Sequence, residues 1–138
     1  MANEANITAV DLFAGCGGMS LGFEKAGVDV VAAYDNWDAA IDVYRANFEH
    51  PVFKRDLSDV SVAEEVSSFS PDIIIGGPPC QDFSQAGKRS EDGGRAILSV
   101  RYAEIIAKCT PQFIVMENVQ KVSALSFHVT LLAWGRFR

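Results

Sequence analysis

One cysteine stands where a nucleophile could be held rigidly. Cys80 ends the run at residues 76–80, which reads GGPPC. The run follows residues 71–75, whose three β-branched isoleucines are typical of a buried parallel strand. Two prolines and two glycines are unfavourable at a plain strand end, but they suit a thiol that must be presented to a substrate. We therefore interpret Cys80 as a candidate nucleophile.

A second predicted strand, residues 112–116, ends in an acid and an amide, Glu117 and Asn118. The carboxyl ends of parallel strands meet at one edge of a sheet, so these two residues should lie beside Cys80. A carboxyl group there could exchange a proton with the substrate while the thiol attacks. Taken alone, a Glu-Asn pair after a strand is more often a turn or a helix cap.

A glycine-rich segment follows the first predicted strand, residues 7–13, and opens a helix over 19–26. Gly15, Gly17 and Gly18 allow a ligand to approach the backbone, and the N–H groups at the start of the helix could bind a carboxylate. The dinucleotide pattern fails because its third glycine position is Ser20, which disfavours NAD. Without further motifs, an ordinary strand-to-helix turn is an equally good interpretation.

Polar and apolar side chains also follow the next two predicted strands, residues 28–34 and 51–53. Asp35, Asn36 and Trp37 follow the first of these strands, and Asp56 and Leu57 follow the second. They offer acceptors for ribose hydroxyls and for a base edge, together with apolar surfaces for a ring. The sequence therefore predicts ligand contacts at three successive strand ends.

The elements that must position these residues alternate between β-rich runs and segments of helical periodicity. Further helices are predicted over 37–48 and 96–108, and a short helix or turn over 62–69. An exposed loop is predicted over 81–95, and a loop followed by a helix over 119–138. This alternation predicts an α/β fold with an open, mostly parallel, Rossmann-like sheet.

The composition narrows the class of protein. With 138 residues, 49% hydrophobic and 22% charged, the chain fits one globular domain. Neither a secretory signal nor an apolar run of about 18 residues is present, so we expect a cytoplasmic location. The three scattered cysteines favour neither disulfides nor a zinc site, and we interpret Cys16 as an apolar filler and Cys109 as an inert buried thiol. A net charge of -6 argues against a strong grip on phosphates by this chain alone.

Residues 11–18 (DLFAGCGG), 77–84 (GPPCQDFS) and 117–119 (ENV) together resemble the DNA cytosine C5 methyltransferase family in order and spacing. The resemblance covers residues 7–120 and implies the S-adenosylmethionine-dependent methyltransferase fold, S-adenosylmethionine as cofactor, duplex DNA as partner and no metal. It implies that Cys80 adds to a flipped cytosine, that Glu117 with Asn118 supports the adduct, and that the loop with Lys88, Arg89 and Arg95 closes over the base. The implied cofactor residues are Phe13, Gly15, Gly17, Gly18, Asn36, Trp37, Asp56, Leu57, Pro79 and Leu98.

The chain departs from the family pattern in two places. Family members have an acidic residue where this chain has Asn36, so Asp35 could take over the ribose contact. Family members also continue beyond the ENV motif with a target-recognition region, so we expect residues 1–138 to form a partial cofactor-binding and catalytic domain, incomplete at its C-terminal end. The isolated chain should then methylate DNA weakly, and a tRNA cytosine methyltransferase or a catalytically silent cofactor-binding module remain alternatives.

Overall fold

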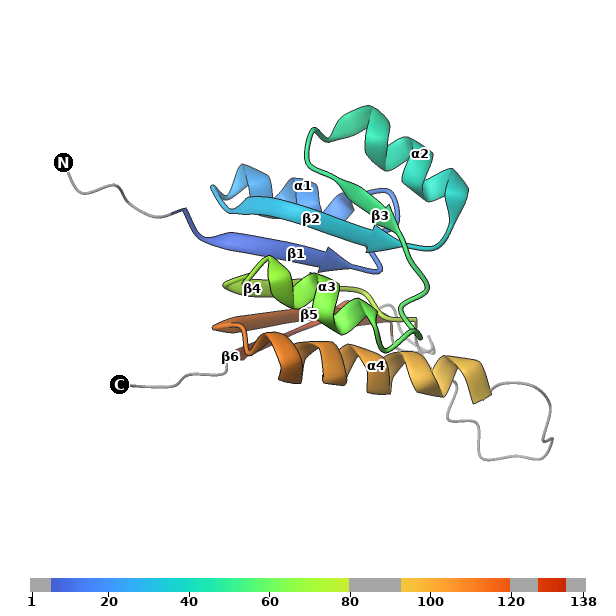
Figure 1. Ribbon diagram of the computed structural model, residues 1–138. Coiled ribbons are helices and arrows are strands. Elements are labelled where there is room, and N and C mark those ends of the chain that lie inside the picture. Colours follow the sequence, from blue (N-terminus) through green and yellow to red (C-terminus); the bar gives the residue numbers. More distant parts are fainter. Residues whose placement is uncertain (1–5, 80–92, 120–126, 134–138) are drawn as a thin grey trace.

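The computed structural model describes residues 6–79, 93–119 and 127–133, and these residues form a six-stranded sheet covered by helices (Figure 1). The strands lie in the lateral order β3-β2-β1-β4-β5-β6. Five strands are parallel, and only β6 runs antiparallel to its neighbour. The strands are β1 (Thr8–Leu12), β2 (Asp29–Asp35), β3 (Val52–Lys54), β4 (Ile73–Gly76), β5 (Phe113–Val119) and β6 (Phe127–Ala133).

Two pairs of helices cover the two faces of the sheet. The helices are α1 (Gly18–Lys25), α2 (Asp38–Asn47), α3 (Val62–Ser68) and α4 (Gly93–Cys109). Side chains of α3 and α4 pack on one face, whereas α1 and α2 pack on the other. In the described part of the chain, no helix is long and apolar enough to cross a membrane. The predicted α/β class with a Rossmann-like sheet is confirmed.

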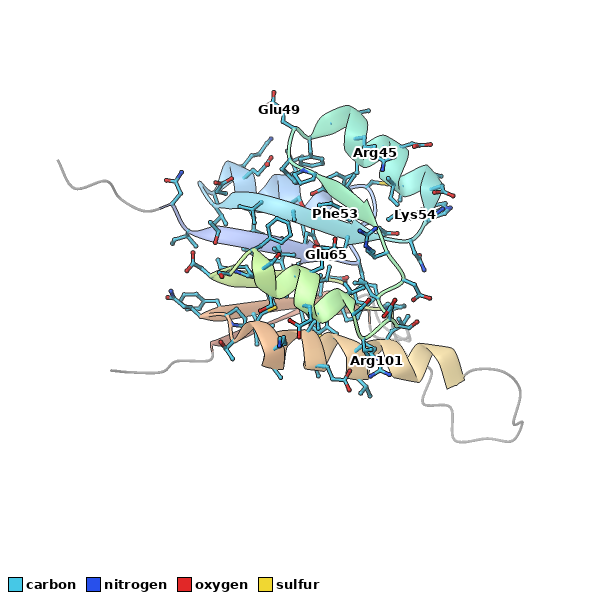
Figure 2. All side chains as sticks on the ribbon, in the orientation of Figure 1. Arg45, Glu49, Phe53, Lys54, Glu65 and Arg101 are labelled. Carbon is cyan, nitrogen blue, oxygen red and sulfur yellow. The ribbon has the colours of Figure 1, made fainter. Side chains whose placement is uncertain are left out.

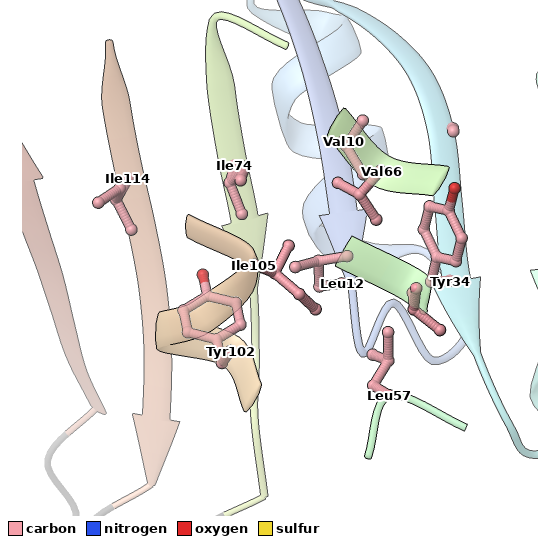
Figure 3. Packing of buried hydrophobic residues seen from close by; sticks show 11 residues of the cluster. Val10, Leu12, Tyr34, Leu57, Val66, Ile74, Tyr102, Ile105 and Ile114 are labelled. Atoms are coloured by element: carbon pink, nitrogen blue, oxygen red, sulfur yellow. The ribbon is translucent and has the colours of Figure 1, made fainter. Parts of the chain in front are cut away.

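The larger apolar core lies between the sheet and the α3/α4 pair (Figure 3). Val10 and Leu12 of β1 point into it, as does Ile74 of β4, and Tyr102 and Ile105 of α4 cover them. All five side chains are buried. Because a parallel sheet has helices on both faces, its central strands can be apolar almost throughout.

The order of the strands reverses direction between β1 and β4. From β1 the chain builds outward through β2 and β3, and it then returns to β4 on the other side of β1. Ligands of open α/β sheets bind at the carboxyl ends of the strands at such a reversal. The fold therefore points to the segments after Leu12 and Gly76.

Two predicted elements are wrong. Residues 127–133 form strand β6 instead of the predicted helix, and they pair with β5 from Val119↔Phe127 to Phe113↔Ala133. Without β6, the backbone of β5 would present an unpaired sheet edge, and pairing satisfies it. Helix α4 begins at Gly93 rather than at residue 96, because a helix anchored by Tyr102 and Ile105 gains one hydrogen bond for each residue by which it extends.

Candidate active site

The strand register brings the predicted site segments to one edge of the sheet. Leu12 pairs with Tyr34 on one side and with Gly76 on the other, and Gly76 pairs with Met116. Residues that follow these four positions are therefore neighbours. A side chain at Gly76 would lie 2.5 Å from the Leu12 carbonyl oxygen, so glycine lets the ends of β1 and β4 approach closely.

A hollow of about 90 Å³ opens at this edge. Ligand pockets are usually roughly 300–1,000 Å³, so the hollow can hold one part of an elongated ligand. Five of the predicted cofactor residues line it together, and Asp35 and Arg55 line it as well. The five predicted residues are Phe13, Asn36, Leu57, Pro79 and Leu98.

Phe13 begins the ligand turn, the name used here for residues 13–18. Its φ of 59° lies in the left-handed region, which costs a residue other than glycine of the order of 1–3 kcal/mol. Its ring packs against Tyr102 of α4, with the ring centroids 6.2 Å apart, and also lines the hollow. The fold thus holds an aromatic face at the point where strand order reverses.

The Asp35 carboxylate ties the ligand turn to the turn after β2. Its Oδ2 accepts from the Gly15 N–H at 2.8 Å, and its Oδ1 accepts from the N–H groups of Asn36 at 2.8 Å and Trp37 at 2.9 Å. These bonds fix two of the turns that border the hollow. Asp35 therefore acts on the shape of the hollow as well as lining it.

The three predicted glycines have different surroundings. Gly15 has φ +54° and open space where a side chain would be, and Gly18 begins α1 with open space as well. Gly17 has φ +90°, and a side chain there would overlap the Phe48 ring and lie 2.9 Å from Cε2 of Tyr44. Gly17 is therefore required by packing against α2 and the residue after it, which the sequence pattern did not reveal.

Two other predicted residues lie at the edge but do not line the hollow in the described part of the chain. Trp37 is 65% exposed at the start of α2. Asp56 is exposed, and its Oδ1 accepts from the Ser58 N–H at 2.9 Å. Hydrogen bonds from Ser58 hold the pKa of Asp56 below its ordinary value, so it stays an ionised acceptor. The expectation that Cys16 is an apolar filler is wrong, because Cys16 is exposed in the ligand turn.

Glu117 lies beside the segment that leads to Cys80. A side chain built on Gly77 would lie 3.2 Å from Glu117 Oε2, so the carboxylate directly faces the first residue after β4. The predicted nucleophile Cys80 and the side chain of Asn118 lie outside the described residues, as do Lys88, Arg89 and the Arg95 side chain. The predicted proximity can therefore be followed only as far as Gly77 and Pro79.

Arg55 is the lining residue that the sequence did not single out. Its Nε donates to Glu65 Oε2 at 2.9 Å, and its Nη1 donates to the Lys54 carbonyl oxygen at 2.9 Å. Its guanidinium group also lies 5.7 Å from the centroid of the Phe53 ring. Figure 2 shows Phe53 and Lys54 on β3 and Glu65 on α3, the elements that hold Arg55. Its position directly after a short strand was the available signal.

Arg101 of α4 holds the loop that carries Asp56 and Leu57, because its Nε donates to the Ser58 carbonyl oxygen at 3.0 Å. No group of three or more potential metal ligands occurs among the residues described. The site is thus built from apolar walls, carboxylates and backbone N–H groups. This composition suits an organic ligand that combines a flat ring with polar groups.

Comparison with known proteins gives matches across this region. The family model for C-5 cytosine-specific DNA methylases matches residues 7–134. Type II methyltransferase M.HindV of Haemophilus influenzae is 51% identical over 114 residues, which are 82% of this chain and 38% of that protein. Type II methyltransferase M.HgiGI of Herpetosiphon aurantiacus is 51% identical over 120 residues, which are 86% of this chain and 95% of that protein.

A solved structure of a Spodoptera frugiperda DNMT2 variant matches with a TM-score of 0.68 and 29% identity, over 85% of this chain and 36% of that one. The chain spans about two fifths of the length of the curated relatives M.HindV and M.HgiDI, at 38% and 39%.

Proposed function

The chain belongs to the family of C-5 cytosine-specific DNA methylases, and from this membership we propose that it carries the catalytic centre for methyl transfer to C5 of cytosine in DNA. The observation that carries the proposal is the β4–β5 register, which places Gly77, three residues before Cys80, against the Glu117 carboxylate. A nucleophile and a proton-exchanging group are needed side by side for this chemistry.

S-adenosylmethionine is the cofactor of such an enzyme, and when bound it supplies an electrophilic methyl group. The lining of the hollow fits part of it: Phe13 offers an aromatic face, Leu57 and Leu98 offer apolar walls, and Asn36 offers polar groups for ribose hydroxyls. Asp56 would accept from the adenine amino group, and Trp37 would pack on the ring. The backbone of Gly15, Gly17 and Gly18 would face the methionine portion, and Pro79 would close the pocket.

The residues of the chain prepare the base. The Cys80 thiolate adds to C6 of a flipped cytosine, which makes C5 nucleophilic. Negative charge develops toward N3 of the base, and Glu117, supported by Asn118, meets it with a hydrogen bond or a proton. Once C5 carries the methyl group, loss of the C5 proton and expulsion of Cys80 restore the aromatic ring.

Binding of duplex DNA would draw on segments beyond these 138 residues, as a complementary part of the enzyme. Support for this comes from the net charge of -6 and from relatives that extend well past the matched region. Residues 1–138 would then be the cofactor-binding and catalytic part of the enzyme. A DNA substrate also agrees with the cytoplasmic location expected from the sequence.

Covalent trapping tests the proposal. In the presence of S-adenosylmethionine, this chain supplemented with the C-terminal part of M.HindV should form a stable adduct with duplex DNA that contains 5-fluorocytosine. Once C5 carries the methyl group, fluorine cannot leave as a cation, so Cys80 is not expelled. Cys80→Ser should abolish the adduct, since a serine hydroxyl is negligibly ionised near neutral pH. An adduct that maps to a residue other than Cys80 would contradict the proposal. Trapping on tRNA that contains 5-fluorocytosine, with none on DNA, would also contradict it.

Cys109→Ser is the matched control for trapping and should leave the adduct intact. Cys109 lies at the end of α4, and burial raises the pKa of its thiol to about 11, so it is largely protonated near neutral pH. Calorimetry tests the cofactor pocket separately: Phe13→Ala and Asp56→Ala should each weaken binding of S-adenosylmethionine. If both variants bind as the parent does, the pocket is misplaced.

A further inference from the structure

A chain of hydrogen-bonded side chains, which the proposed chemistry does not use, runs beneath the ligand turn. Ser20 Oγ lies 2.6 Å from Asp11 Oδ2, and Tyr44 Oη lies 2.6 Å from Ser20 Oγ. Tyr44 Oη also lies 2.6 Å from His50 Nε2, and His50 Nδ1 lies 3.0 Å from Glu24 Oε1. The four short contacts join β1, α1, α2 and the segment before β3.

The chain leads from the interior to solvent. Asp11, Ser20 and Tyr44 have no exposed surface, whereas the His50 side chain is 11% exposed and that of Glu24 is 38% exposed. Asp11 Oδ1 is buried and has no hydrogen-bond partner among the residues described. A charge on Asp11 is therefore poorly compensated at the inner end of the chain.

This chain adjoins the ligand turn at three points. Asp11 lies in β1 two residues before Phe13, and Ser20 lies in the first turn of α1 two residues after Gly18. The Tyr44 ring fills the space against Gly17. A change in the hydrogen bonds of Asp11 or Tyr44 must therefore act on backbone that forms the turn.

The hydroxyl protons allow the chain two complete arrangements. In the first, Asp11 is ionised, Ser20 donates to it, Tyr44 donates to Ser20, and His50 donates from Nε2 to Tyr44 and from Nδ1 to Glu24. In the second, every proton between His50 and Asp11 has moved one bond: Asp11 is protonated and donates to Ser20, Ser20 to Tyr44, and Tyr44 to Nε2 of a neutral His50. Both arrangements hold the same number of protons and keep all four contacts.

The surroundings of Asp11 favour its protonated form, which the second arrangement contains. Burial raises the pKa of Asp11 from 3.8 to about 7, hydrogen bonds from Ser20 oppose this, and the nearby Asp35 carboxylate adds to it. The two ring nitrogens of His50 contact different partners, and Glu24 faces Nδ1 in both arrangements. Burial raises the pKa of Tyr44, and also of Tyr102 on the other face, so the phenols keep their protons.

We propose that Tyr44 and His50 are positioning residues of the ligand turn, and that one proton is shared between Asp11 and His50 through Ser20 and Tyr44. The charge beneath the ligand turn is then set by a chain that opens to solvent at His50 and Glu24. A cationic ligand such as S-adenosylmethionine benefits from the arrangement with an ionised Asp11. This last consequence rests on the proposed function, whereas the proton sharing does not.

The first test uses the parent chain without cofactor or DNA. Nitrogen NMR of histidine-labelled protein follows the His50 ring, with His128→Gln to assign the two histidines, and infrared spectroscopy follows the carboxyl band of protonated Asp11. A shared proton makes the Asp11 and His50 signals change together in each protonation step as the pH is raised, because the steps of interacting groups belong to the pair. If Asp11 alone changes in one step and His50 alone in another, the proposal is overturned.

The second test breaks the chain. Asp11→Asn imitates the protonated carboxyl, so it should hold His50 neutral with its proton on Nδ1. In a Tyr44→Phe background the same substitution should leave the His50 signals unchanged, whereas in a Tyr34→Phe background it should act as in the parent. Tyr34 is the matched control, since it is a buried phenol on the other face of the sheet. An equal response in all backgrounds, or no response in any, would overturn the sharing.

Calorimetry addresses the ligand turn itself. In the parent and in Tyr34→Phe, binding of S-adenosylmethionine should tighten as the pH rises through the step in which the shared proton is lost, and it should follow the His50 signal. In Tyr44→Phe the pH dependence of binding should no longer follow the His50 signal. If it still does, the positioning role is wrong. If no variant binds the cofactor while the NMR and infrared results hold, it is the proposed function that fails.

Discussion

The two faces of β1, the strand that leads into the ligand turn, are held by different kinds of interaction. On the α3/α4 face, Val10 and Leu12 belong to the larger apolar core, so this face is held by close packing. On the α1/α2 face, the intervening Asp11 enters the hydrogen-bonded chain that ends at His50. One face of β1 therefore packs in a single arrangement. On the other face, we propose two arrangements of the protons. Both faces therefore contribute to stability, but only the α1/α2 face does so through buried groups that exchange protons.

The largest effect is expected on the apolar face. Ile74→Ala should lower the free energy of unfolding by about 2–5 kcal/mol, because Ile74 is fully buried and its loss leaves a cavity. Urea unfolding measures this. Val60→Ala, at a position that is 62% exposed, should change the value by no more than about 0.5 kcal/mol. Equal losses at the two positions would mean that packing on this face is not what holds the fold.

The α1/α2 face should make the unfolding free energy depend on pH. Because the pKa of Asp11 is raised to about 7 in the fold, its contribution to stability is fully present below its ordinary value of 3.8 and is lost as the pH rises through about 7. The unfolding free energy of the parent, relative to Asp11→Asn, should therefore fall between pH 4 and pH 8 by at most about 4 kcal/mol. Unfolding curves across this range measure the difference, and a constant difference would contradict the prediction.

Removal of one buried hydroxyl from each face sharpens the comparison. Tyr44→Phe should lower the unfolding free energy by about 1–3 kcal/mol, because it leaves Ser20 and His50 without their shared partner. Tyr34→Phe should cost less, because its hydroxyl has only a 3.5 Å contact with Glu65. Thermal unfolding of the two variants shows which substitution costs more unfolding free energy. A larger loss in Tyr34→Phe than in Tyr44→Phe would contradict the prediction.

The smallest effect is expected at the rim of the site. Arg55→Gln should change the unfolding free energy by no more than about 1 kcal/mol, because its ion pair with Glu65 is partly exposed. Calorimetry should nevertheless show weaker S-adenosylmethionine binding, since Arg55 lines the hollow. Lys54→Gln removes a comparable exposed ion pair, with Asp38, away from the hollow and serves as the control. Equal binding by the two variants would remove Arg55 from the site.

The sequence was enough to predict those elements whose structure is determined by a local pattern of residues. Strong β-branched runs predicted β1, β2 and β4, and Gly27, with φ +87°, ends α1 as a capping glycine should. The predicted contribution of Asn36 and Leu57 to one site followed from the rule that parallel strands end at a common edge. Phe13 and Leu98 were placed there by the family resemblance, because no local pattern brings a helix residue to that edge.

Contacts between distant segments were beyond the sequence. The pairing of residues 127–133 with β5 depends on the unpaired edge of β5, since the seven residues alone were interpreted as helical. The role of Gly17 depends on Tyr44 and Phe48, which lie more than 25 positions away in the chain. The chain from Asp11 to His50 likewise unites four segments and has no local motif. Such contacts between distant side chains depend on tertiary packing, so the hydrophobic periodicity of the sequence does not predict them.

The antiparallel direction of β6 determines where the protein can be immobilised or labelled without covering the ligand turn. Ala133 pairs with Phe113, which lies beside Ile73, which in turn lies beside Ala9, so the end of β6 and the start of β1 lie at the same edge of the sheet. The ligand turn lies at the opposite edge, about 15–20 Å away across strands of five to seven residues. A sensor surface, fluorophore or affinity tag joined at Ala9 or Ala133 would therefore lie at the edge opposite the ligand turn.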